Sequence, residues 1–397
     1  MGGSARHWFL AGAFLIIVGT PAVVGWFEPD LAVSAAEKRL LNPPPAPPRS
    51  LADAETWPRR FEAYFNDHFG LRGPLAFAYS WLRYRIGDSP SDQVVRGRAG
   101  WFYLNGRMHG DPVGDYRGLN RFTPAELARF VRALRVKTDW LRARGADYLF
   151  VVAPNKHTIY PEFLPEYLAP LAPDTALDQL TAAVSAQGDL PFLDLRAALR
   201  AARASGRRAF HRTDSHWNAW GANFAQYALV RRLNAESAAG VRPRRWPASS
   251  YVWRRRGGGD LALLMGLQRV LGEMAPEAHF PSCATAVRTV SAHPVIRETA
   301  CGAGGGTLLV FRDSFFEALR PYVSTYFDRA VFVDHRAEPE LLKRLVARYR
   351  PDVVVEEWVE RLLPMVPDVA GLDTASDRWG SPTARRGPGD GPGRAPR

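Results

Sequence analysis

A serine and an aspartate–histidine pair are the residues of this chain whose types fit a nucleophilic reaction. Ser314 stands in the segment 310–316 (VFRDSFF), where an apolar run passes directly into a predicted helix. Asp214 and His216 stand two positions apart in a polar loop. A serine hydroxyl becomes a good nucleophile when a histidine takes its proton and a carboxylate holds the other ring nitrogen. These residue types predict serine-dependent acyl transfer.

Each segment also has a simpler interpretation. Ser314 sits where a serine commonly caps the helix that follows a strand. The loop with Asp214 and His216 precedes Asn218, which is well placed to cap the next helix. Metal ligation by Asp214 and His216 is another alternative, but the sequence offers no evident third ligand, and we predict no metal.

A third segment, 155–160 (NKHTIY), follows the first predicted strand of the sheet. Its position predicts that Asn155 donates to an oxyanion and that Tyr160 lines the acceptor site. Trp217, beside the histidine, is a further candidate for substrate contact. The alternative is that Asn155 only shapes a turn and that Lys156 is solvated.

Other polar and aromatic segments rank lower. Asp334 and His335 form a rival pair, but neighbouring residues of an extended segment point to opposite sides. The run 257–260 (GGGD) lacks the Lys-Ser/Thr of a phosphate loop, so we expect a flexible turn. The tryptophans that are candidates for stacking on sugars, or for ordinary packing, are Trp57, Trp81, Trp101 and Trp253.

Helical and strand patterns alternate from about residue 123 onward. The predicted strands are 147–153, 191–195, 306–311, 330–333 and 352–355. The predicted helices are 124–144, 175–187, 196–204, 218–233, 315–322 and 339–349. Repeated strand–helix units predict an α/β fold with an open, mostly parallel sheet flanked by helices. Functional side chains then gather at the carboxyl ends of the strands.

The N-terminal residues decide the compartment. Residues 8–27 are uncharged, long enough to span a bilayer and flanked by tryptophan, which predicts a transmembrane helix. A cleaved signal peptide with a site near 33–35 is the alternative. Residues 42–48 (NPPPAPP) read as a stiff spacer, and 57–71 as an amphipathic helix that packs on the main body. Both alternatives predict an exported protein.

The resulting division has an anchor or signal segment (1–27), a Pro-rich spacer (28–55), one catalytic domain (56–372) and a disordered Gly/Pro/Arg tail (373–397). Cys283 and Cys301 are the only cysteines, and in an exported protein they would form one disulfide; two unrelated buried thiols are the alternative. The net charge of +12 suits an acidic polymer, anionic lipid or a compositional bias. Without a nucleic-acid motif it does not indicate nucleic-acid binding.

The motif Asp-x-His-Trp-Asn at 214–218, followed about a hundred residues later by Asp-Ser-Phe at 313–315, resembles a known family. It is similar to the SGNH-hydrolase-like O-acetyltransferases of bacterial exopolysaccharide systems, of which alginate O-acetyltransferase is the best-known member. The aspartate and histidine precede the serine there, a permuted order relative to ordinary SGNH esterases. The resemblance extends to segments 61–69, 154–160 and 351–356.

The resemblance implies an O-acetyltransferase of the single-domain, anchored type in the bacterial inner membrane, with its catalytic domain in the periplasm. It implies an acetyl-serine intermediate, a polysaccharide acceptor, no cofactor and a multispanning membrane acyltransferase that supplies acetyl. Arg312 departs from the pattern, because ordinary SGNH enzymes carry glycine there, which questions an oxyanion role for that amide. A polysaccharide esterase with the same three residues and a non-catalytic export scaffold are the alternatives.

Overall fold

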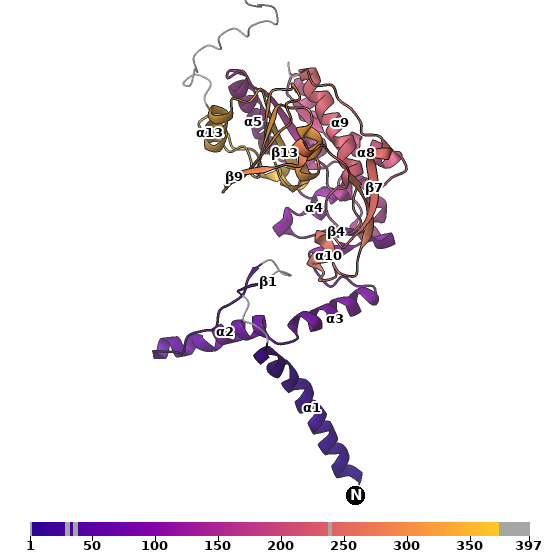
Figure 1. Cartoon of the computed structure of the whole chain (residues 1–397), viewed down its shortest axis with the longest axis vertical. Helices are drawn as coiled ribbons and strands as arrows, with labels where there is room; N and C mark the ends of the chain where they lie inside the picture. Colours follow the sequence, from indigo (N-terminus) through magenta and orange to yellow (C-terminus); the bar gives the residue numbers. More distant parts are fainter. Residues whose placement is uncertain (1, 28–31, 35–38, 237–239, 373–397) are drawn as a thin grey trace, which may run out of the picture.

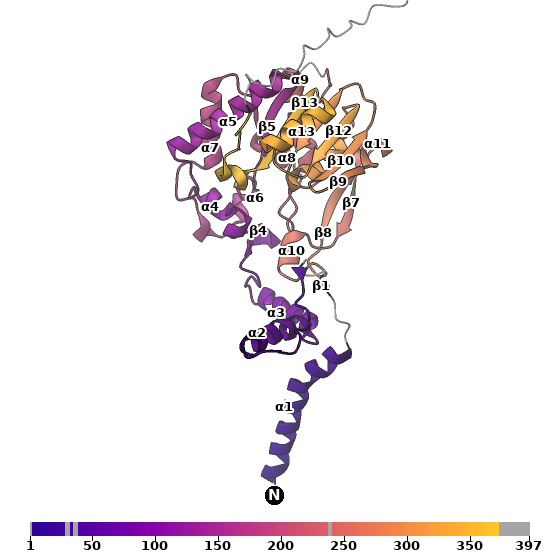
Figure 2. The same ribbon diagram turned by 90° about the vertical axis from the view of Figure 1, so that its left-hand side faces the viewer.

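The computed structural model describes residues 2–27, 32–34, 39–236 and 240–372. In this part of the chain a three-layer α/β body is joined to N-terminal helices. Of these, α1 (Gly2–Phe27) and α2 (Leu51–His68) lie apart from the body (Figure 1), and α3 (Arg72–Arg85) packs on it through Phe77, Trp81 and Tyr84. A seven-stranded sheet forms the middle layer, and helices cover both of its faces (Figure 2). The predicted tail, 373–397, lies outside the described residues.

The sheet has the strand order β6-β5-β13-β11-β12-β10-β9, and its first five strands run parallel. These five are β5 (Asp147–Ala153), β6 (Phe192–Asp194), β11 (Thr307–Phe311), β12 (Arg329–Val333) and β13 (Val353–Val359). They are the five strands that the sequence predicts. The largest difference is in β13, which continues to Val359 instead of ending at residue 355.

Antiparallel strands that the sequence analysis does not predict complete the structure. β10 (Val295–Ala300) pairs with β12, and β9 (Arg288–Ala292) pairs with β10 at the edge of the sheet. β7 (Tyr251–Arg256) and β8 (Glu273–Ala278) form a separate antiparallel pair. These strands carry many charged and exposed residues, so they lack the continuous apolar run that marks a buried parallel strand.

Side chains of β5 alternate between two hydrophobic clusters, one on each face of the sheet. Tyr148, Phe150 and Val152 belong to the cluster with α5 (Pro124–Arg142), α7 (Ala176–Gln187) and α13 (Pro339–Tyr349). The alternate residues of β5 belong to the cluster with α8 (Arg196–Ala204), α9 (Ala219–Glu236) and α12 (Arg320–Ser324). The shorter helices of the body are α4 (Pro112–Arg117), α6 (Lys156–Ile159), α10 (Asp260–Leu264) and α11 (Ser282–Thr285).

The N-terminal part contains α1 (Gly2–Phe27), a small pair of strands, β1 (Val33–Ser34) and β2 (Arg39–Leu40), α2 (Leu51–His68) and α3 (Arg72–Arg85). The predicted helix at 57–71 therefore begins earlier, at Leu51, where Ser50 caps it. The expectation that this helix packs on the main body is wrong, because α2 has no buried residue. The Pro-rich segment instead lies along α2, and Trp57 donates its indole hydrogen to Ala46.

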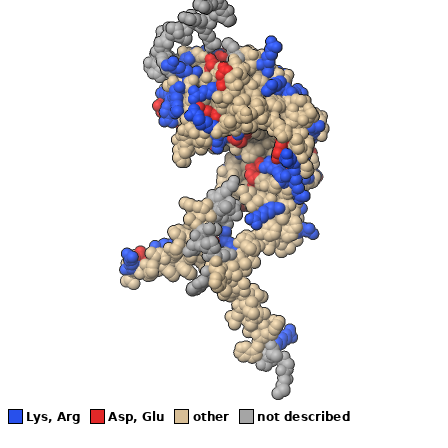
Figure 3. Space-filling view, in the orientation of Figure 1, with Lys and Arg blue, Asp and Glu red and all other residues tan. Residues whose placement is uncertain are grey.

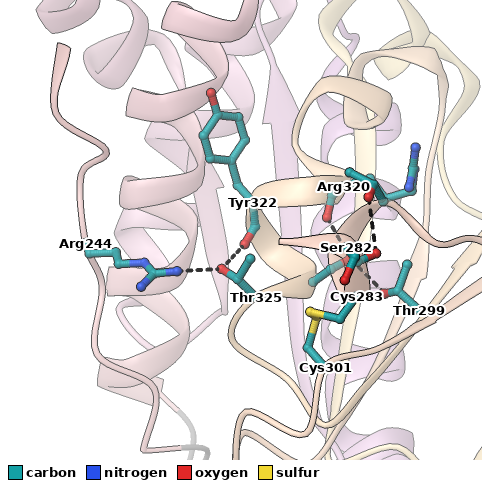
Figure 4. The surroundings of a disulfide bond; sticks show 10 residues. Arg244, Ser282, Cys283, Thr299, Cys301, Arg320, Tyr322 and Thr325 are labelled. Carbon is teal, nitrogen blue, oxygen red and sulfur yellow. Dashed lines mark hydrogen bonds between the residues drawn. A yellow bond between two sulfur atoms is a disulfide. The ribbon is translucent and has the colours of Figure 1, made fainter. Parts of the chain in front are cut away.

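The predicted disulfide is present in the structure. Cys283 of α11 is bonded to Cys301, which directly follows β10 (Figure 4). The bond ties α11 to the antiparallel edge of the sheet beside α12, where Thr299 also donates to Ser324 at 2.8 Å.

A buried histidine joins the sheet to a small hairpin. The hairpin consists of β3 (Val94–Arg96) and β4 (Phe102–Leu104), which pair antiparallel. His157, which follows β5, donates its Nε2 hydrogen to the Leu104 carbonyl at 3.0 Å. Burial, with the neighbouring charge of Lys156 as a second cause, lowers the pKa of His157 to about 3. The imidazole is therefore neutral in the folded protein at neutral pH.

This lowered pKa predicts a loss of stability in mild acid. As the pH falls below about 6.5, the unfolded state takes up a proton on His157 that the folded state does not. The unfolding free energy should then fall by about 1.4 kcal/mol per pH unit from this group. Replacing His157 with Gln should flatten the curve of chemical-denaturation stability between pH 6.5 and 5. Replacing the exposed His335 with Gln is the control, and equal slopes in the two variants would contradict the assignment.

Candidate active site

The carboxyl ends of the parallel strands bring three polar segments to one edge of the sheet. Ser314 follows β11, Asn155 follows β5, and Arg361 follows β13, which lies between these two strands. Asp214 and His216 come from the loop between α8 and α9, on the face of the sheet that these helices cover. Segments about a hundred residues apart therefore meet at this edge.

A chain of two hydrogen bonds connects the three predicted residues. The Asp214 Oδ1 atom lies 2.7 Å from His216 Nδ1, and His216 Nε2 lies 2.8 Å from the Ser314 Oγ atom. With the proton on Nδ1, the imidazole donates to the carboxylate and accepts from the serine hydroxyl. The ring of Phe315, 4.7 Å away between centroids, packs against the imidazole. This geometry is the one that activates a serine hydroxyl.

The loop with Asp214 and His216 is held by buried groups. Lys156 is 2% exposed, and its Nζ donates to three carbonyls of this loop, among them that of Asp214 at 2.6 Å. The Glu273 carboxylate accepts from the backbone N–H groups of Arg212 and Thr213. The alternative that Lys156 is solvated is wrong, because the side chain is buried and carbonyl oxygens surround its ammonium group in place of water. This burial lowers the pKa of the lysine to about 8.

Sequence reasoning missed the contribution of the run 257–260, which is not a free turn. The backbone of Gly259 lies against Asp214, where an added Cβ would be 2.3 Å from the Asp214 Cβ. The next residue, Asp260, accepts from the backbone N–H of Ser215 at 2.6 Å, and its Oδ2 lies 3.5 Å from His216 Nδ1. The glycine-rich run and the carboxylate that follows it can be seen in the sequence. Their role becomes clear only when the fold places them beside the loop with Asp214.

The two carboxylates set the electrostatics of the imidazole. Burial lowers the pKa of His216, but the hydrogen bond and charge of Asp214 and the charge of Asp260 outweigh it, so the pKa is raised. Burial raises the pKa of Asp214, and the hydrogen bond and charge of His216 reverse this, leaving the pKa below its ordinary value. Burial and the Asp214 charge raise the pKa of Asp260. A proton taken up by His216 is thus stabilised.

Asp214, His216 and Asp260 also present ligand atoms within 4.8 Å of one another. The sequence-based statement that no third ligand is evident is therefore corrected. A carboxylate bonded to Nδ1 is equally the arrangement that orients a catalytic imidazole. The cluster by itself does not specify a metal.

Backbone N–H groups on both sides of Ser314 already donate hydrogen bonds within the fold. Asp313 accepts from the backbone N–H of Phe315 at 2.8 Å and from that of Val359 at 2.6 Å, which fixes the 3-10 turn Ser314–Ala318. The Arg312 N–H donates to the Val333 carbonyl at 3.0 Å, within the sheet. That amide is engaged in strand pairing, which agrees with the doubt raised by the sequence about an oxyanion role.

An open cavity of about 540 Å³ adjoins the serine hydroxyl. Among the three predicted substrate-contact residues, only Trp217 lines it. The charged residues that line it are Asp214, Arg256, Arg297, Arg312 and Glu317. Three of these five residues are arginines and two are carboxylates.

Tyr160 and Asn155 lie elsewhere. Tyr160 is 3% exposed and packs against Trp101 in the core, with ring centroids 4.4 Å apart, and its hydroxyl accepts from the Ala209 N–H. The predicted role of Tyr160 in lining the acceptor site is wrong, because the side chain packs beneath the loop. Asn155 is buried; its N–H donates to Glu360, and its Oδ1 accepts from Arg361 at 3.3 Å. It does not line the cavity, so its predicted oxyanion role lacks geometric support.

The rival pair lies outside this arrangement. His335 is exposed, and its Nδ1 faces the Arg336 carbonyl at 3.1 Å rather than a serine. Asp334 lies 3.9 Å from the Arg312 guanidinium.

The sequence matches a model of the family described as "SGNH hydrolase-like domain, acetyltransferase AlgX" over residues 94–299, just over half of the chain. The chain belongs to this family. The matched region of this SGNH-hydrolase-like acetyltransferase contains Asp214 and His216 and ends before Ser314. A protein named probable alginate O-acetylase AlgJ of Pseudomonas aeruginosa is 26% identical over 345 residues, which cover 79% of this chain and 81% of that protein.

Other relatives are more distant or match less of the chain. The protein of the same name from Pseudomonas fluorescens is 24% identical, over 55% of this chain and 53% of its own length. The solved O-acetyltransferase domain of Pseudomonas putida AlgJ is 20% identical with a TM-score of 0.44, covering 71% of this chain and 95% of that domain. PatB1 of Bacillus cereus with a sulfonyl adduct is 13% identical with a TM-score of 0.48, covering 69% of this chain and 100% of that one.

The contact of Gly259 with Asp214 gives a testable prediction. Replacing Gly259 with Ala forces the Asp214 carboxylate to shift, and a misplaced catalytic group costs about a hundredfold in turnover. Hydrolysis of a chromogenic acetyl ester should fall by this order, while circular dichroism remains that of the wild type. The matched control is Gly257→Ala, whose added Cβ would have its nearest neighbour at 3.3 Å. Equal activity of the two variants would refute the positioning role.

Proposed function

We propose that this chain transfers acetyl groups to hydroxyls of an exported polysaccharide through an acetyl-serine intermediate at Ser314. The observation that supports this most directly is the 2.8 Å contact between His216 Nε2 and the Ser314 Oγ atom, with Asp214 on the other ring nitrogen. The family supplies acetyl transfer as the reaction class. Relatives named alginate O-acetylase support a polysaccharide as the acceptor.

In the first half-reaction, the Ser314 oxygen attacks the acetyl carbonyl while His216 Nε2 takes the hydroxyl proton. Asp214 stabilises the imidazolium that forms. The tetrahedral intermediate collapses, the bond to the donor's leaving group breaks, and His216 returns the proton to that group. Acetyl-serine and the deacylated donor result.

In the second half-reaction, a sugar hydroxyl enters the cavity and attacks the acetyl-serine carbonyl. His216 accepts the sugar proton and then returns it to the Ser314 oxygen as the ester bond breaks. The acetylated sugar leaves and the enzyme is restored. The three arginines of the cavity already pair with Asp214 or Glu317, and together these five residues leave one positive charge, which favours an anionic sugar.

The same proposal places the body outside the inner membrane. Residues Arg6–Gly25 form a helix long and apolar enough to cross a bilayer, with a mean hydropathy of 2.0. An uncleaved helix would keep the enzyme beside a multispanning acyltransferase that delivers acetyl, which is the partner that the family resemblance implies. A signal sequence passes the same test of length and composition.

Replacing Ser314 with Ala tests the reaction. The variant should lose acetyl transfer from a chromogenic acetyl ester to an oligosaccharide, by a factor of about a thousand or more, because the nucleophile is gone. The matched control is Ser291→Ala, which removes a serine hydroxyl from β9 at the antiparallel edge of the sheet and should leave transfer unchanged. Mass spectrometry of the acceptor measures transfer, and released acetate is measured in parallel.

Each outcome of this experiment separates the candidates. Transfer that depends on Ser314 supports the acetyltransferase. Free acetate without acetylated acceptor, again dependent on Ser314, indicates a polysaccharide esterase. Turnover that persists in Ser314→Ala refutes the mechanism, and no turnover in the wild type favours the scaffold alternative.

A further inference from the structure

Helix α3 carries apolar residues on two opposite faces. Phe77, Trp81 and Tyr84 pack against the small cluster of the β3–β4 hairpin and α10. The second face carries apolar side chains that point away from the body, at spacings of four, three and four residues. These are Leu75, Tyr79, Leu82 and Ile86, which are 51%, 58%, 61% and 73% exposed, and we call them the outer stripe. A helix that is apolar on both faces needs a second apolar surface.

Helix α2 adds a row of aromatic rings that continues to Phe69, just after the helix; Phe61 and Phe65 are exposed, and Trp57 and Phe69 are half-buried. Trp57 stacks on Phe61 at 5.0 Å, Phe61 lies 6.2 Å from Phe65, and Phe65 lies 5.5 Å from Phe69. No residue of α2 is buried, and the Phe61 and Phe65 side chains are 42% and 41% exposed. Contiguous exposed apolar surface of this kind marks a contact site.

Both helices meet at the end of α1. Gly70, between α2 and α3, packs so closely on α1 that an added Cβ would lie 2.2 Å from the Pro21 carbonyl oxygen and 2.3 Å from the Gly25 nitrogen. Figures 1 and 2 both show α2 and α3 near the end of α1 that is nearest the body. Figure 3 shows α1 as an almost uncharged rod. The outer stripe therefore starts at Leu75, five residues after the contact of Gly70 with the apolar helix.

The charges of α3 identify the surface that it faces. Between Arg72 and Arg85 this helix contains three arginines and no acidic residue. Tyrosine, tryptophan and phenylalanine favour the headgroup level of a bilayer, and arginine favours anionic headgroups. A helix with an apolar face and a basic flank lies in the plane of such an interface.

We propose that α3 lies in the headgroup region of an anionic bilayer, with its outer stripe inserted among the lipids, and that α2, in which four carboxylates outnumber two arginines, contributes only the exposed rings of Phe61 and Phe65 to this contact. This inference rests on the proposed membrane insertion of α1. The anchor, the interfacial helices and the body then have fixed positions relative to the membrane. Because Phe77 and Trp81 of α3 pack on the hairpin cluster, the position of α3 at the membrane also fixes the position of the body.

Single-cysteine variants of the full chain in lipid nanodiscs test the proposal. Since the two native cysteines form a disulfide, an introduced cysteine can carry an environment-sensitive fluorophore. Tyr79→Cys and Leu82→Cys probe the outer stripe. Val18→Cys reports insertion of α1, and Ala347→Cys on α13, far from α1, is the control. Nanodiscs contain phosphatidylglycerol and phosphatidylethanolamine, with or without a nitroxide-labelled lipid.

The expected result is a loss of fluorescence at positions 79 and 82 with nitroxide near the headgroup, and at position 18 with nitroxide near the bilayer centre. Position 347 should keep its fluorescence. Quenching at 18 without quenching at 79 and 82 overturns the inference and leaves the anchor intact, and would favour a protein partner for the stripe. No quenching at 18 removes the anchor and the inference together. Equal quenching when phosphatidylcholine replaces phosphatidylglycerol overturns the role of anionic lipid.

Discussion

A buried ammonium group and the loop that it holds are the constraint on which the site depends. The Lys156 Nζ donates to the carbonyls of His211, Arg212 and Asp214, at distances of 3.0, 3.2 and 2.6 Å. A buried charge is costly unless it is fully hydrogen-bonded, so the loop can take few other shapes without leaving the lysine unsatisfied. Because Asp214 belongs to this loop, its carboxylate and the imidazole beside it are placed before any substrate arrives.

The serine is placed by different means. Its position depends on the end of β11 and on the Asp313 carboxylate, which accepts hydrogen bonds from two backbone N–H groups. The sheet therefore positions Ser314, and the loop between α8 and α9 positions His216. The hydrogen bond between His216 and Ser314 forms only if both parts of the fold are correctly placed. A small change in the residues that support the loop, such as Gly259, should therefore lower activity.

The sequence predicted the parallel part of the sheet because its strands are continuous apolar runs separated by helices. It also predicted that Asp214, His216 and Ser314 would meet, because their residue types and their places at the ends of predicted elements can be read from the sequence. It failed at Tyr160, whose burial depends on Trp101 from a distant hairpin. It also missed Asp260, because nothing local shows that a glycine-rich run will press against the loop.

The antiparallel strands also could not be predicted from local sequence. β10 pairs with β12, and β9 pairs with β10, so the charged residues of these strands carry no local signal of a sheet. Helix α2 shows a second limit of prediction from sequence. Its aromatic periodicity predicted a helix correctly, but periodicity alone does not distinguish an apolar face that meets the body from one that faces elsewhere.

The most direct test of the account is the rate at which a sulfonyl fluoride modifies Ser314, followed by mass spectrometry of the labelled peptide. If His216 removes the hydroxyl proton, the wild type should be labelled at Ser314, and His216→Ala should react more slowly by about a hundredfold or more. Equal labelling rates in the two proteins, or labelling at another residue, would contradict the claim that this histidine activates this serine.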